Sequence, residues 1–172
     1  HPDERRINYV GQEPPGLTAE LFSPGMISTD SMEHSAPAFS PDGEVVLWTV
    51  LDKQYRASMM EMVFEDGKWS EGRRPTFADS TADDYYPSFS PDGKWLAVGR
   101  RLENASLGTM TQLAVIPTSG GEPHDLTMEF DRGVDFDSPR PMVWATDSRS
   151  IYFQSSDSGT IGVYRVKVTG GA

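Results

Sequence analysis

Short apolar stretches alternate with tight-turn sequences along most of the chain. In residues 86–98 an apolar stretch leads into the sequence Ser-Pro-Asp-Gly at positions 90–93, and a second apolar stretch follows it. Proline presets φ at the first central position of a β-turn, aspartate bonds to the backbone beyond itself, and glycine accepts a positive φ. This stretch therefore predicts two β-strands joined by a tight turn.

The same pattern occurs three times. Residues 36–48 repeat the Pro, Phe, Ser, Pro, Asp and Gly of residues 86–98 at equivalent positions. Residues 142–153 form a third copy, in which Trp144 replaces the phenylalanine and Asp-Ser replaces Asp-Gly at positions 147–148, so that its turn type is left open. The turn aspartates are 50 and then 55 residues apart. A regular repeat of this length is typical of a β-propeller built of four-stranded antiparallel blades.

The apolar runs locate the expected strands. Those of the first repeat cover residues 36–40, 45–51, 57–64 and 70–77, and those of the second cover 86–90, 95–101, 112–117 and 122–127. The third repeat ends after a strand over residues 162–168 and lacks a fourth. Residues 17–28, where apolar patches flank a Pro-Gly turn, predict an edge strand that belongs to the outer side of another blade. The chain then divides into an extended lead-in (1–16), this outer strand (17–28) and three blades (36–79, 86–128 and 138–172).

Three blades do not close a ring, since propellers typically have about 4 to 8 blades. In one solution, two chains pair about a twofold axis as a homodimer, and each N-terminal strand completes the third blade of the partner. Such a six-bladed ring leaves no sheet edge exposed. In the other solution, the sequence is the first part of a longer propeller. The sequence leaves both solutions open.

Composition supports an all-β domain and narrows the range of partners. The 172 residues suffice for one domain, and the 16 glycines and 13 prolines fit many short strands better than helices. A net charge of -11, with the basic residues scattered, excludes nucleic acid as the expected partner. The lack of cysteine excludes disulfides and thiolate chemistry. No apolar run approaches the about 20 residues of a membrane span, and a first residue other than Met favours a trimmed, exported protein.

The repeated residues resemble a known family. Phe-Ser-Pro-Asp-Gly followed by an apolar strand is similar to the repeat of TolB-like β-propellers, which also occurs in the propeller domains of prolyl-oligopeptidase-type serine peptidases. Residues 119–127 are similar to the "Gly-Gly … Leu-Thr" outer strand of these repeats. The resemblance implies a propeller in a periplasmic or extracellular bacterial protein that binds proteins or small ligands. It does not imply one chemistry.

The sequence offers little for catalysis or metal binding. It has no Gly-x-Ser-x-Gly elbow and only three histidines, none in a recognisable triad spacing. Aspartates alternate in one loop at Asp131, Asp135 and Asp137, a pattern that Ca²⁺ can use, but the loop lacks the spacing of an EF-hand. A solvated acidic loop is the simpler interpretation, and no cofactor is predicted.

The best candidate site is the mouth of the propeller channel. The loop that enters each innermost strand lies there, so the residues just before the repeated aromatic residue should gather at one rim. The set comprises Glu33, His34, Asp84, Tyr85, Asp137 and Arg140. Acids, aromatic rings and an arginine at one rim suit a polar ligand; the alternative is that these charges only keep the rim hydrated and that Tyr86 is core.

The sequence thus predicts a non-enzymatic binding module for a protein, glycan or small polar ligand. The alternative is an enzyme class, in which the chain is the non-catalytic propeller part of a prolyl-oligopeptidase-type peptidase or of a carbohydrate-active enzyme.

Overall fold

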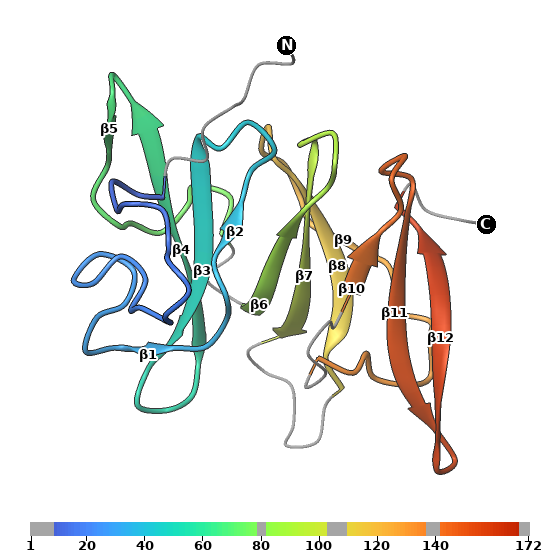
Figure 1. Cartoon of the computed structure of the whole chain (residues 1–172). Helices are drawn as coiled ribbons and strands as arrows, with labels where there is room; N and C mark the ends of the chain where they lie inside the picture. Colours follow the sequence, from blue (N-terminus) through green and yellow to red (C-terminus); the bar gives the residue numbers. More distant parts are fainter. Residues whose placement is uncertain (1–8, 79–81, 103–109, 137–141, 169–172) are drawn as a thin grey trace.

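The structure, a computed structural model, describes residues 9–78, 82–102, 110–136 and 142–168. These residues contain strands, turns and loops but no helix, so no helix among them could cross a membrane. The strands form three antiparallel sheets that stand side by side in the order of the sequence (Figure 1). The all-β, antiparallel prediction is confirmed.

Sheet one has an interrupted inner strand. Two short pieces, β1 and β2, both pair with β3: Glu33 lies opposite Val50 and Phe39 lies opposite Val46. The remaining strands follow outward in the order β3-β4-β5. The strand bounds are β1 (Met32–Glu33), β2 (Ala38–Phe39), β3 (Val45–Leu51), β4 (Ala57–Glu65) and β5 (Lys68–Trp69).

Sheets two and three have a continuous first strand and a simple meander order. Sheet two has four strands in the order β6-β7-β8-β9, and sheet three has three in the order β10-β11-β12. The bounds in sheet two are β6 (Ala82–Phe89), β7 (Trp95–Leu102), β8 (Gln112–Pro117) and β9 (His124–Asp125). Those in sheet three are β10 (Met142–Trp144), β11 (Ser150–Asp157) and β12 (Thr160–Lys167).

The Ser-Pro-Asp-Gly turns are held by their own side chains. The hydroxyl of Ser90 donates to Asp92 at 2.7 Å and accepts from the backbone N of Trp95 at 3.0 Å. Gly93 has a φ of 71°, which a glycine adopts without steric cost. In the first repeat, the hydroxyl of Ser40 likewise donates to Asp42 and accepts from the backbone N of Val45. The serine and the aspartate of the repeat therefore serve backbone geometry.

The core lies between the sheets, and β7 contributes to both of its layers. Leu96 and Val98 belong to the cluster shared with sheet one, whereas Ala97 belongs to the cluster shared with sheet three. Because successive side chains of a strand point to opposite faces, a strand buried on both faces is apolar throughout. This explains the uninterrupted apolar runs of the central strands.

The N-terminal segment is not the strand that the sequence predicts. Residues 17–28 contain turns and only an isolated bridge between Pro24 and Ser28. The backbone N atoms of Met26, Ile27 and Ser28 all donate to the carbonyl of Ser23, which closes a tight loop. Phe22 and Ile27 of this segment instead pack with Val10 on the outer face of sheet one, against Trp48 and Met62. Its other large apolar side chains, Leu17, Leu21 and Met26, are exposed.

Two predicted outer strands are shorter than expected. The strand over 70–77 is replaced by β5 and an isolated bridge between Glu61 and Arg73. The strand over 122–127 is reduced to β9. The inner strand expected from residue 86 starts earlier, at Ala82. The ends of the third repeat, at 138–141 and 169–172, lie outside the described residues.

Candidate functional site

Three aromatic rings form a row that runs from sheet one through sheet two to the segment just before sheet three. The rings of His34 and Tyr86 lie 5.3 Å apart, and the phenol of Tyr86 lies 3.1 Å from Nε2 of His34. On its other side Tyr86 stacks on Phe136, with centroids 5.8 Å apart and planes within 4°. Phe136 stands just before sheet three, where the backbone N of Asp135 donates to the carbonyl of Gln154 on β11. The row therefore joins elements of all three sheets.

Tyr86 has an unusual backbone. Its φ is 53°, in the left-handed region that bulky residues rarely adopt. The pairing of β6 with β7 also slips between Tyr85 and Ser88, as in a β-bulge. Bulges re-aim side chains, and strained residues of this kind gather at functional sites, each at a cost of about 1–3 kcal/mol. The surrounding structure holds Tyr86 in this conformation against that cost.

A buried ion pair lies in the same part of β6 and β7. Asp84 and Arg100 are directly opposite in the strand pairing. Nε and Nη2 of Arg100 donate to the two carboxylate oxygens at 2.9 and 3.2 Å, and the side chains are 4% and 6% exposed. Bidentate geometry of this kind is the strongest that an arginine offers a carboxylate. This ion pair fixes the register of β6 and β7 next to the aromatic row.

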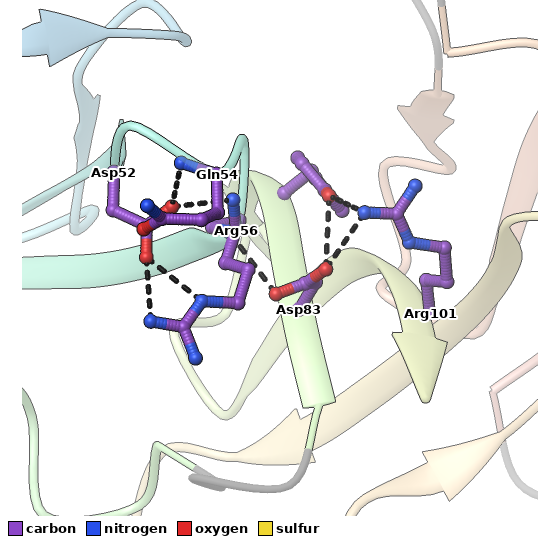
Figure 2. Close-up of polar contacts among 7 residues, drawn as sticks. Asp52, Gln54, Arg56, Asp83 and Arg101 are labelled. Carbon is purple, nitrogen blue, oxygen red and sulfur yellow. Dashed lines mark hydrogen bonds and ion pairs between the residues drawn. The ribbon is translucent and has the colours of Figure 1, made fainter. Parts of the chain in front are cut away.

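A second ion pair, between the neighbouring residues Asp83 and Arg101, also contacts a tyrosine. Nη2 of Arg101 donates to Asp83 and to the phenol of Tyr85, both at 2.8 Å. Figure 2 shows the contact of Arg101 with Asp83. The guanidinium also lies 5.6 Å from the centroid of the Tyr85 ring. Burial, followed by the charge of Asp83, raises the pKa of Tyr85 to about 12. Tyr85 is therefore a neutral phenol at neutral pH.

The predicted site residues have different surroundings. His34 is exposed, and its ring lies 5.7 Å from that of Tyr85 and against Tyr86. Glu33 accepts hydrogen bonds from the backbone N and the hydroxyl of Thr29, at 3.0 and 2.8 Å. Asp84 is occupied by its buried ion pair. Asp137 and Arg140 lie outside the described residues, and the ligand-binding role of all six stays a prediction.

Sequence reasoning missed Phe136, Arg100 and Arg101. The signal for the arginines was present: folding residues 82–102 as a hairpin places the pair Asp83-Asp84 opposite Arg100-Arg101. In the sequence alone the two arginines count only among scattered basic residues. Phe136 carries no such signal, because its contact with Tyr86 depends on how sheets two and three pack.

The acidic loop gives no metal cluster in the part of the chain that the structure describes. No group of three potential ligand side chains comes together there. Asp131 lies 3.6 Å from Nε of Arg132, and Asp137 is among the residues that are not described. The Ca²⁺ assignment of Asp131, Asp135 and Asp137 stays a weak prediction.

Comparison with known proteins gives likeness in structure only. No protein-family model matches the sequence. No curated protein is significantly similar to it. Among solved structures, a TolB protein (described as putative TolB) from Agrobacterium tumefaciens matches 84% of this chain with a TM-score of 0.56 and 17% identity. TolB from Acinetobacter baumannii matches 78% of this chain, with a TM-score of 0.51 and 19% identity.

A peptidase shares the same architecture. A puromycin-hydrolyzing peptidase of Mycobacterium tuberculosis matches 76% of this chain, with a TM-score of 0.54 and 16% identity. The chain spans about half (48%) of the Agrobacterium protein, 30% of the Acinetobacter protein and 20% of the peptidase. At these identities the likeness concerns the fold. The three antiparallel sheets and these matches show that the chain has the fold of the TolB-like β-propellers.

Proposed function

We propose that this chain is a non-enzymatic β-propeller binding module whose ligand binds at the channel mouth beside His34 and Tyr86. The observation that carries the proposal is the contact between an exposed imidazole and the phenol of a tyrosine held at a φ of 53°. A protein maintains such a conformation only where the surrounding contacts offset its cost. Here those contacts are the stack on Phe136 and the two ion pairs of β6 with β7.

The chemistry of the rim favours a ligand with a polar group and a flat apolar face. The exposed ring of His34 offers a face for stacking, and the nitrogens of His34 and the hydroxyl of Tyr86 are hydrogen-bonding groups. A protein segment, a glycan or a small polar molecule meets this description. The family resemblance implies binding of proteins or small ligands, and we take a segment of a partner protein as the first candidate.

A binding screen with matched variants tests the proposal. Peptide and glycan libraries are screened against the wild-type chain, and hits are measured again with His34→Ala and Tyr86→Phe. His124→Ala is the matched control, because His124 is an exposed histidine on the outer strand β9. We expect both rim variants to weaken binding about tenfold or more, since each removes a hydrogen-bonding group from the contact. Equal affinity of all three variants for every hit would refute the proposal.

A second candidate function rests on the likeness to the mycobacterial peptidase. In that case the chain is the non-catalytic propeller portion of a serine peptidase, and the same mouth admits substrate. The coding sequence beyond residue 172 discriminates between the two: an α/β-hydrolase region with a Gly-x-Ser-x-Gly elbow favours the peptidase. Peptidase activity of the protein expressed from that longer sequence is the biochemical check.

We also propose that a second copy of the chain covers the outer face of sheet three. Val143, Ile161 and Val163 on this face are 50%, 63% and 70% exposed, and Tyr152 is 39% exposed. Neighbouring strands place Val143 opposite Tyr152. Exposed apolar rows on a sheet mark contact surfaces. Light scattering tests the pairing: twice the 19.0 kDa mass of the chain is expected, and a monomer that keeps its sheet content refutes it.

Export to the periplasm or the extracellular space is part of the same proposal. It rests on the family resemblance, and cell fractionation of the native host tests it.

A further inference from the structure

A polar cavity of about 250 Å³ lies between sheets one and two, apart from the aromatic row. Its walls come from the loop after β3, the start of β4, the segment after β5 and the start of β6. Three groups of side chains line it: Asp52 with Arg56, Ser58 with Arg74, and Asp83 beside two alanines. Small-molecule sites usually measure about 300–1,000 Å³, so this cavity suits a ligand of only a few heavy atoms.

The first carboxylate of the cavity is already saturated. Oδ1 of Asp52 accepts from the backbone N of Gln54 and of Arg56, at 2.8 and 3.0 Å. Oδ2 accepts from Nε of Arg56 at 2.8 Å and lies 2.7 Å from Nη2 (Figure 2). A carboxylate offers about four acceptor positions. Asp52 therefore has none left for a ligand.

The second carboxylate is nearly saturated and joins the two sheets. Oδ1 of Asp83 on β6 accepts from the backbone N of Ala57 on β4 at 3.0 Å. Oδ2 is bonded to Arg101 and accepts from the phenol of Tyr85 at 3.3 Å. Figure 2 shows Asp83 between Arg101 on one side and the Arg56 loop on the other. These contacts therefore hold Asp83 in place without any ligand.

Arg74 leaves hydrogen-bond donors unused. Its Nη2 donates to the hydroxyl of Ser58, and Arg74 makes no ion pair with any carboxylate in the part of the chain that the structure describes. A guanidinium has five N–H donors. Asp52 is paired with Arg56, and Asp83 with Arg101, which does not line the cavity. The lining holds two arginines and two aspartates, and of the two arginines the exposed Arg74 is the one with no carboxylate partner among the described residues.

We propose that this cavity binds a small monocarboxylate, with the carboxylate held by Arg74 and the hydroxyl of Ser58. Unused donors on a cationic side chain favour an anion over a cation. Planar guanidinium donors match a carboxylate and a phosphate alike. The two lining carboxylates repel a phosphate dianion more strongly than a singly charged carboxylate, which favours the carboxylate.

Titration of the whole chain with acetate, lactate and inorganic phosphate tests this site. Backbone amide shifts in the NMR spectrum are followed at Ala57 and Ala82, which line the cavity, with choline chloride as a control for ionic strength. Acetate or lactate should saturate these shifts at lower concentration than phosphate or chloride. Arg74→Gln should weaken carboxylate binding about tenfold or more, and Ser58→Ala by less.

Arg149→Gln is the matched control, because it removes an exposed arginine from the turn of sheet three. It should leave the affinity unchanged, and thermal unfolding verifies that each variant is folded. Absence of saturable shifts, tighter binding of phosphate than of carboxylates, or equal affinity of Arg74→Gln and the wild type would overturn the proposal.

Discussion

The hydroxyl of Ser148 accepts a hydrogen bond of 3.0 Å from the backbone N of Asp92, which ties the turn of sheet three to the turn of sheet two. Ser148 stands where the other copies of the repeat have glycine, and its φ of 60° is close to the 76° of Gly43 and the 71° of Gly93. The third copy thus keeps the turn conformation although its sequence departs. Serine in place of glycine adds a hydrogen bond between the two sheets, but it places a residue with a side chain in the unfavourable left-handed region of φ.

Substitutions of Ser148 should separate these two effects. Ser148→Ala loses the hydrogen bond and keeps the unfavourable φ, so we expect the free energy of unfolding to fall by about 1 kcal/mol. Ser148→Gly loses the same bond but relieves a conformation that costs a non-glycine residue about 1–2 kcal/mol, so its stability should stay near that of the wild type. Urea unfolding of the two variants is the measurement. Equal stability of the two would contradict this assignment.

Neutralising either member of the Asp84–Arg100 pair should destabilise the fold strongly. Asp84→Asn and Arg100→Met each remove one charge of a buried ion pair, which typically costs about 3–5 kcal/mol. The matched control is Lys94→Met, because Lys94 is 77% exposed and lies 3.8 Å from Asp92; we expect a change below about 1 kcal/mol. Denaturant unfolding at neutral pH compares the three. An effect at either position as small as that of Lys94→Met would contradict this prediction.

Local features of the fold could be predicted from the sequence, whereas features set by packing could not. The turn at Ser90 and its two flanking strands depend on contacts within a few residues, as the bonds to Asp92 and Trp95 show. The N-terminal segment has apolar residues spaced as in a strand, but Ile27 packs on sheet one from a tight loop instead. The apolar pattern of this segment predicts neither its conformation nor its burial, since Leu17, Leu21 and Met26 are exposed.

Some residues of the candidate site could likewise be predicted from the sequence, and others could not. The entry loops of the repeat indicated His34 and Tyr85, and the structure brings their rings within 5.7 Å. Phe136 was not indicated, because its stacking on Tyr86 arises from the packing of neighbouring sheets. Asp84 looked like a free rim acid, yet its partner Arg100 becomes apparent only when the strand register is known.

Alkaline pH should destabilise the protein through Tyr85. The pKa of Tyr85 is raised from 10.0 to about 12 in the folded state, first by burial and then by Asp83. The folded state therefore keeps this proton after the unfolded state has lost it, and stability falls as pH rises from 10 toward 12. Tyr85→Phe should lack this part of the fall. Unfolding free energies across that range are the measurement, and an identical slope in the variant would count against the assignment.

The close approach of Gly99 to Phe136 offers the most direct control over the aromatic row. A Cβ on Gly99 would lie 2.8 Å from Cζ of Phe136, closer than real side chains approach one another. Gly99→Ala should therefore displace the phenylalanine ring, disturb its stack on Tyr86 and cost about 1–3 kcal/mol.

Stability and near-ultraviolet circular dichroism together report these two effects. Shortening the neighbour in Gly99→Ala/Phe136→Leu removes the clash, so the double variant should recover much of the stability but not the aromatic signal. If Gly99→Ala alone leaves both quantities unchanged, the ring has room to move and the row is not held from this side. A loss of stability in the single variant that is recovered in the double variant locates the constraint at the contact between Gly99 and Phe136. Ligand binding by the two variants then distinguishes whether binding needs only a folded rim or also an intact aromatic row.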